Sequence, residues 1–451
     1  MRAVVYRGPD DLRVETLPVP RIGPDELLVK VAACGVCPTD IKKIQYGTVP
    51  PPRVFGHETA GVVVRVGARV RRFKIGDRVA LHHHVPCLDC HFCRHRAFAQ
   101  CAAYKRTGVT AGFEPAGGGF AEYVRVLPFV LPGVVKIPSR NSFEEGTMLE
   151  PVNTVLKAVR RLSLLRGDVV LVAGQGPVGL MFTRLLELHG ANVIATDLLE
   201  TRLKLAKQFG ARWTFRVETP HMNQPSPGQR PPSPIRWERD GVRGNVSHPA
   251  APLSHPMGEG RGEGASTFNP QPSTLIHRLT HGRGLDAAII AVPSDAVVCQ
   301  AQAWLRGGGQ LLLFAHTRRS APSLNPPPEP RSSRREEAHS ISGEGSQSLL
   351  TSAATVQGFD TQMRSGLSQP STLNFPLDLA SICVDEKDLL GSYSADFTLQ
   401  AEVARLVFSR RLDVRPLVTH RFPLEQTAEA VRLAARPTPD SLKVVVSQDA
   451  I

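Results

Sequence analysis

The sequence contains little cysteine and no long apolar run. No stretch approaches the roughly 20 apolar residues that a membrane span requires, so we expect no membrane association. The first residues, MRAVVYRGPDDLRVE, lack the apolar core of a signal peptide. Eight cysteines in 451 residues, with no sign of secretion, favour thiols held by metal over disulfides. We therefore expect a cytoplasmic protein.

The net charge of +13 raises the question of nucleic-acid binding. The arginines are scattered, however, and the one dense basic run is short (Arg69, Arg71, Arg72 and Lys74). We therefore expect no nucleic-acid partner. Hydrophobic residues at 41% and charged residues at 21% are typical of a globular protein, and the length allows two or three domains.

The pattern of the chain changes near residue 150. Residues 1–150 contain short β-rich runs such as LLVKVAACG and ETAGVVVRVG, separated by glycine and proline. From Asp168 onwards, strand-like runs (DVVLVAG, NVIATD, LDAAIIAV, GGQLLLFA) alternate with helix-like segments, one of them near Ala296–Leu305. Such alternation predicts a parallel sheet covered on both faces. DLLGSY and LQAEVARLVFS are expected to supply its last strand and helix.

Two segments, at about 216–274 and 317–375, interrupt this alternation. Both are rich in proline, glycine, serine and arginine and have too few apolar residues to form a core. We interpret them as disordered insertions in surface connections of the sheet domain, since loops of this length are uncommon in compact domains. A lid or a partner-binding arm is the alternative.

Four cysteines lie close together in the motif CLDCHFCRHRAFAQC, at Cys87, Cys90, Cys93 and Cys101. Thiolates at this spacing can surround one tetrahedral Zn²⁺, and four protein ligands leave no position for substrate. The motif therefore predicts a structural zinc. The preceding run of His82, His83 and His84 is interpreted as structural or exposed, because the four thiolates already complete a site.

GQGPVG at Gly174–Gly179 follows an apolar strand and opens a helix, the context in which GxGxxG indicates dinucleotide binding. Gly174 permits a tight turn, Gly176 lets the backbone approach a pyrophosphate, and Gly179 lets helix and strand pack closely. The helix that opens at Pro177 and Val178 supplies free N–H groups and positive potential for the phosphates.

Asp197 ends the next strand, about 20 residues further on. A carboxylate there can bind the hydroxyls of an adenine ribose and would repel a 2′-phosphate, which favours NAD over NADP. Arg202 lies nearby and could stack on the adenine or weaken that preference.

A second group of possible zinc ligands is more widely spaced. Cys37 lies in CGVCPTD, His57 and Glu58 lie in FGHE, and Glu150 lies in LEPVNT. Three protein ligands would leave one position on Zn²⁺ for water or substrate. The spacing alone leaves a second reading open, in which His57 and Glu58 are simply polar strand residues.

The order and spacing of these motifs resemble one known family. CGVCPTD, FGHETAGVVVRVG, GDRVAL, the four-cysteine loop, LEPVNT and GQGPVG together resemble the zinc-dependent medium-chain alcohol dehydrogenases, in the branch of the sorbitol, threonine and related polyol dehydrogenases. The resemblance covers nearly all of the chain except the two insertions. It implies an α/β protein in which a GroES-like β-rich catalytic domain (1–151) precedes a Rossmann domain (152–411), with residues 412–451 returning to the catalytic domain.

The resemblance also implies residue roles. Cys37, His57 and Glu58 would hold a catalytic zinc, with Glu150 beside it as an alternating or water-linked ligand, and Glu58 and Glu150 compete for the third ligand position. Asp40 would hydrogen-bond His57, and Thr39 would bring its hydroxyl to the substrate oxygen. The reaction implied is hydride transfer from a secondary alcohol or polyol to NAD, in a homodimer or homotetramer.

Two residues depart from the family pattern. Pro38 replaces the usual glycine and would stiffen the loop that carries Cys37 and Thr39, and Lys42 replaces a relay histidine of threonine dehydrogenases. The second departure argues against threonine as substrate. Two other functions remain open: an NAD(P)H-dependent carbonyl reductase of the same family, and a catalytically impaired, zinc-stabilised scaffold.

Overall fold

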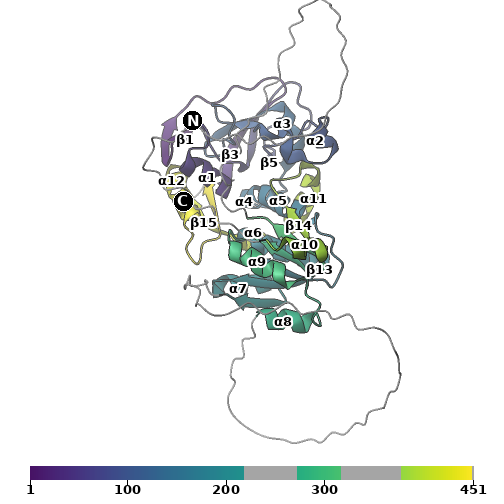
Figure 1. Cartoon of the computed structure of the whole chain (residues 1–451). Helices are drawn as coiled ribbons and strands as arrows, with labels where there is room; N and C mark the ends of the chain where they lie inside the picture. The colour runs from purple at the N-terminus through teal and green to yellow at the C-terminus, as the bar shows by residue number, and fades with distance from the viewer. Residues whose placement is uncertain (218–271, 316–376, 449–451) are drawn as a thin grey trace, which may run out of the picture. The chain divides into compact units, whose positions relative to one another are not determined.

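Two large sheets organise the chain, of which this computed structural model describes residues 1–217, 272–315 and 377–448 (Figure 1). All helices and strands of these residues belong to one unit, Met1–His316 with Asp378–Ile451. Within the described ranges, no helix is both long and apolar enough to cross a bilayer. The greater part of the two predicted insertions lies outside the described residues.

The first sheet has eight strands and is built from both ends of the chain. Its path runs β15-β16-β3-β4-β5-β8, with β7 joined to β3 and β6 to β7, while β1 and β2 form a separate hairpin. The strands are β1 (Arg2–Gly8), β2 (Asp11–Thr16), β3 (Leu27–Gly35), β4 (Glu58–Val66), β5 (Arg78–Ala80), β6 (Val109–Thr110), β7 (Tyr123–Val126), β8 (Val135–Lys136), β15 (Val418–Phe422) and β16 (Lys443–Ser447).

Strand β16 enters this sheet from the far end of the sequence. It pairs antiparallel with β3, and β15 pairs parallel with β16. The yellow C-terminal strand therefore lies beside the purple N-terminal elements in Figure 1. This pairing carries Lys443, at the start of β16, to the end of β3 where the motif CGVC begins.

The second sheet is parallel throughout its six strands, in the order β11-β10-β9-β12-β13-β14. This is the doubly wound order of a Rossmann sheet, as the alternation of strands and helices predicted. Its central strands are apolar almost without interruption because they are buried on both faces. The strands are β9 (Val169–Ala173), β10 (Asn192–Asp197), β11 (Trp213–Arg216), β12 (Leu285–Ile290), β13 (Leu305–Leu313) and β14 (Asp388–Gly391).

The helices lie between these strands in sequence, and short ones border the first sheet. Those of the second half are α5 (Leu149–Val159), α6 (Pro177–His189), α7 (Glu200–Gln208), α8 (Pro272–Leu279), α9 (Asp295–Trp304), α10 (Leu379–Val384) and α11 (Gln400–Phe408). The others are α1 (Pro38–Tyr46), α2 (His91–Arg94), α3 (Ala102–Lys105), α4 (Phe143–Thr147) and α12 (Thr427–Ala435).

The boundaries of the first insertion need correction at both ends. It was expected to span 216–274, but Arg216 is the last residue of β11 and α8 already begins at Pro272. A proline is well suited to the first turn of a helix, where its missing N–H has no partner to lose.

One apolar core joins the two sheets. Leu149 and Val152 of α5 pack in the same buried cluster as Val172 of β9 and Leu180 of α6, and this cluster continues to Val445 of β16. Helix α5 therefore packs against both sheets, and it also carries Glu150.

The contact between α6 and β9 depends on Gly179. A Cβ atom at this position would lie 1.8 Å from the carbonyl oxygen of Gly174, far inside contact distance. At Gly176, by contrast, a Cβ atom would meet nothing within 4 Å, and the φ angle is an ordinary −70°.

We predict that Gly179→Ala lowers the free energy of unfolding by about 1–3 kcal/mol, the usual cost of overpacking, because α6 must move away from Gly174. Urea denaturation measures the loss. The matched Gly176→Ala variant should lose clearly less, because its Cβ would meet no atom within 4 Å, and equal losses in both variants would contradict the steric explanation.

Candidate active site and metal centres

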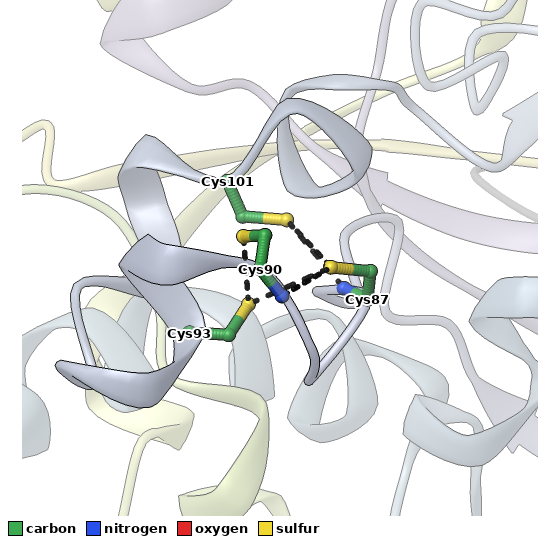
Figure 2. A group of neighbouring side chains, drawn as sticks. All are labelled: Cys87, Cys90, Cys93 and Cys101. Atoms are coloured by element: carbon green, nitrogen blue, oxygen red, sulfur yellow. Dashed lines mark hydrogen bonds between the residues drawn. The ribbon is translucent and has the colours of Figure 1, made fainter.

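The four cysteines predicted to bind zinc face one another in a single loop (Figure 2). The sulfur atoms of Cys87 and Cys93 lie 3.9 Å apart, those of Cys90 and Cys93 3.6 Å apart, and those of Cys87 and Cys101 3.6 Å apart. A disulfide would require about 2.05 Å. Four sulfurs at about 2.3 Å from a tetrahedral Zn²⁺ are about 3.8 Å apart, so the spacing fits that ion.

Backbone groups prepare this loop for thiolates. The N–H of Cys90 points to the sulfur of Cys87 at 3.4 Å, and the N–H of Cys87 points to the sulfur of Cys101 at 3.5 Å. Burial opposes ionisation of Cys101, but backbone donors together with the thiols of Cys87 and Cys93 outweigh it and lower the pKa of Cys101 to about 6. Burial instead raises the pKa of Cys93 to about 12. The loop is anchored by Tyr104, whose hydroxyl donates to the carbonyl of Ala395 at 2.8 Å.

His57 is the centre of the second group of ligands. It is buried, and its Nδ1 lies 3.0 Å from Oδ1 of Asp40, which is itself fully buried in the first turn of α1. Burial alone would lower the pKa of His57, but the neighbouring Asp40 and Cys37 raise it well above its ordinary value. The Asp40 contact leaves Nε2 as the ligand atom of the ring, the usual arrangement for a metal-bound histidine.

Cys37 reaches this position at the start of α1, and Thr39 follows two residues later in the same helix. Cys37 is the N-cap residue, with extended backbone angles, and Pro38 occupies the first helical position, which suits proline. The departure from the family pattern at Pro38 therefore fits a helix start. Cys37, His57 and Glu58 present ligand atoms that all lie within 4.8 Å of one another.

Glu58 is held by a buried lysine. Nζ of Lys443 donates a hydrogen bond to Glu58 Oε1 at 2.7 Å and lies 2.5 Å from Oε2, which it does not meet in hydrogen-bond geometry. Burial alone would lower the pKa of Lys443, but Glu58 and Cys37 raise it, so the side chain is charged. Gly35 makes room for this pair, since a Cβ there would lie 1.9 Å from Glu58 Oε2.

Glu150 approaches His57 from α5. Burial raises the pKa of its carboxyl to about 7, and Glu58 and Asp40 add to the shift while His57 and Lys443 oppose it. Its ligand atom forms a further group within 4.8 Å with those of His57 and His83.

The histidine run is only partly as expected. His82 and His83 are buried and His84 is half-buried, so the exposed reading is wrong for the first two residues. Burial lowers the pKa of His82 to about 4 and that of His83 well below its ordinary value, so both rings are neutral at pH 7. His84 stacks on Tyr104 with ring centroids 4.9 Å apart.

The glycine loop connects β9 to α6. Gly174 has φ of +91°, a conformation that glycine adopts without strain, and Gly176 is the N-cap of α6, followed by Pro177 and the half-buried Val178. A Cβ atom added to Gly176 would meet no atom within 4 Å, so there is free space beside the backbone at this residue. That space is where a pyrophosphate would approach the backbone.

Asp197, at the end of β10, is hydrogen-bonded to the glycine loop. Its Oδ2 accepts from the N–H of Gln175 at 2.6 Å and its Oδ1 accepts from the N–H of Leu199 at 2.9 Å. Arg202 in α7 lies 4.0 Å from Oδ2, and its Nε is buried without a hydrogen-bond partner. Each Asp197 oxygen keeps one lone pair for a further donor.

Sequence reasoning missed three residues of this site. Lys443 starts the strand KVVVS, in which three valines follow it, and a charged residue at the start of such a run indicates a buried partner. Gly35 ends β3 opposite Glu58, which only strand register could reveal. His83 was set aside because the cysteine loop beside it was already complete.

Comparison with known proteins gives the chain its relatives. Residues 23–139 match the family of alcohol dehydrogenase GroES-like domains. The chain is 26% identical to a sorbitol dehydrogenase of Bacillus subtilis over 99% of this chain and 97% of that one. It is 34% identical to the sorbitol dehydrogenase of Rattus norvegicus over 49% of this chain and 62% of the rat protein.

Solved structures show the same fold. A 2R,3R-butanediol dehydrogenase from Bacillus subtilis superposes with a TM-score of 0.67 at 20% identity, covering 99% of each chain.

We predict that the two groups of ligands bind metal independently. Cys37→Ser should lose the zinc near His57 and still fold, unfolding at a higher temperature than Cys90→Ser. Cys90→Ser should lose the other zinc and unfold at a clearly lower temperature, because the loop closed by four thiolates loses its cross-link. Metal analysis paired with thermal unfolding checks both, and loss of the same zinc in both variants would refute separate sites.

We further predict that Lys443→Met destabilises the protein by about 3–5 kcal/mol when exchangeable metal has been removed, because Glu58 is left buried without its cation. Urea denaturation measures this loss. The double variant Glu58→Gln with Lys443→Met should recover most of it. A single variant as stable as the parent would show that Glu58 does not depend on Lys443.

Proposed function

The chain belongs to the zinc-dependent medium-chain alcohol dehydrogenases, in the branch of sorbitol and related polyol dehydrogenases, and from this premise we propose its reaction and the roles of its residues. The reaction is hydride transfer from a secondary alcohol or polyol to NAD. The observation that carries the proposal is the convergence of thiol, imidazole and carboxylate ligands at His57 in a protein that also has an open glycine loop.

The ligand atoms fit zinc. Thiolate, imidazole and carboxylate are all normal Zn²⁺ ligands, and one buried carboxylate oxygen, Asp40 Oδ2, has no hydrogen-bond partner. Cys37 and His57 would hold the ion with Glu58 or Glu150, and the cysteine loop would hold a second, structural zinc. Bound zinc supplies the Lewis acidity that favours the alkoxide form of an alcohol, and the nicotinamide supplies the hydride acceptor.

The protein residues orient ligands and move the proton. Asp40 fixes the His57 ring through its Nδ1, which keeps Nε2 directed away from the carboxylate. Thr39, two residues after Cys37 in the first turn of α1, would accept the proton of the substrate hydroxyl and pass it on towards water. The apolar cluster that includes Leu149 and Val152 of α5 excludes water from the side of the site next to this helix.

The residues of the glycine loop would hold the dinucleotide. Gly176 would leave room for the pyrophosphate, the N-terminus of α6 at Pro177 and Val178 would stabilise its charge, and Asp197 would bind the adenine ribose. Because Asp197 repels a 2′-phosphate, NAD is preferred. NADP remains the alternative, supported by the unpaired Nε of Arg202.

The proposal extends to the organisation of the protein. The domains are 1–151, 152–411 and 412–451, the protein is a homodimer or homotetramer, and it acts in the cytoplasm. Its substrate is a small alcohol. Despite its net positive charge, the protein binds no nucleic acid.

A screen of polyols, amino alcohols and simple secondary alcohols with NAD and NADP, paired with metal analysis, tests the function. We expect two zinc ions per chain, binding of NADH detected by fluorescence, and NAD-dependent oxidation of at least one polyol. One zinc per chain and no NADH binding would instead identify a zinc-stabilised scaffold.

The second candidate is a carbonyl reductase that uses NADH or NADPH, favoured by the same site because hydride transfer is reversible. Initial rates with carbonyl compounds and each reduced cofactor, compared with alcohol oxidation at the same pH, distinguish the two.

A further inference from the structure

A second group of ligands shares His57 with the first. The ligand atoms of His57, His83 and Glu150 all lie within 4.8 Å of one another. His83 comes from the loop after β5, and Glu150 comes from α5. The imidazole rings of His57 and His83 lie with their centroids 4.6 Å apart and are tilted by 40°.

The ring nitrogen Nδ1 of His83 has no hydrogen-bond partner. The residue is only 6% exposed, and this atom is buried. Native proteins rarely leave a buried polar atom unpaired, so such an atom beside other ligand atoms indicates a position for an ion. The nitrogens of His82 are also unpaired, but in the described part of the chain His82 belongs to no group of ligands.

The charges around His57 favour binding of a cation by the group that contains His83 and Glu150 over binding by the group that contains Glu58. The carboxylate of Glu58 is already paired with Lys443, whose ammonium reduces the attraction between Glu58 and a second cation. Glu150 shares the other group of ligands with His83. Because His57 is common to both groups, an ion bound to it can take ligands from either.

We propose that His83 is a ligand of the metal held at His57, so that two imidazoles, His57 and His83, bind the same ion in the resting protein, with Glu150 as the carboxylate of that group. The inference rests on the proposed function, since it assumes a metal at His57. It adds a ligand, in a loop beside the cysteine motif, to the set that the motifs implied.

The test replaces the exchangeable metal with Co²⁺, leaves zinc in the cysteine loop, and counts imidazole ligands by X-ray absorption at the cobalt edge. We expect two imidazoles in the parent protein and one in His83→Phe, which keeps an aromatic ring in the same place. The affinity for Co²⁺ should fall at least about tenfold, the lower limit for losing a group that supports a metal site.

His84→Phe is the matched control, because it removes a neighbouring imidazole and keeps an aromatic ring against Tyr104. It should retain two imidazoles and the parent affinity. The zinc content of the cysteine loop reports folding in every variant, and if His83→Phe fails to fold, the count in the parent protein decides.

Two results would overturn the inference: one imidazole on cobalt in the parent protein, or an unchanged Co²⁺ affinity in folded His83→Phe. A parent protein that takes up no cobalt would overturn the proposed function as well, which separates the two failures.

Discussion

The concentration of negative charge around His57 is the constraint on which the rest of the structure depends. Asp40, Glu58 and Glu150 are all buried there beside the thiol of Cys37. Burying carboxylates is costly unless cations or donors compensate them. Lys443 is one such cation, in direct contact with Glu58. A divalent ion at His57 would supply the rest, so the charges that are costly to bury also make a strong site for zinc.

This constraint gives a role to the pairing of the C-terminal strand β16 with the N-terminal strand β3. Lys443 reaches Glu58 only because β16 pairs with β3, and Gly35 in β3 leaves the space that the ion pair fills. Helix α5 brings Glu150 to the same place, and its apolar residues share one buried cluster with β9 and α6. The glycine loop lies at the end of β9, beside the point where the strand order reverses between β9 and β12, which is where open α/β sheets bind ligands. The metal ligands and the nucleotide loop are thus attached to one apolar core.

Features contained in short stretches of sequence could be predicted, and those formed by distant pairings could not. The cysteine loop and GQGPVG carry their geometry in their own spacing, and the alternation of apolar strands with helices predicted the parallel sheet. Lys443 and Glu58 are separated by 385 residues, and only the register of three strands brings them together. The place of His83 beside His57 could not be predicted, because local sequence gave no sign that the loop after β5 turns back towards His57. Sequence also leaves the choice between Glu58 and Glu150 as the third ligand open, because the pairing of Glu58 with Lys443 bears on it.

Anomalous diffraction at the zinc edge, from crystals grown with NADH, tests the central claim most directly. The account predicts two zinc peaks per chain, one among the four cysteine sulfurs and one beside Nε2 of His57, with the nicotinamide ring next to the second peak. A single peak in the cysteine loop, or a second peak remote from the nicotinamide, would contradict it.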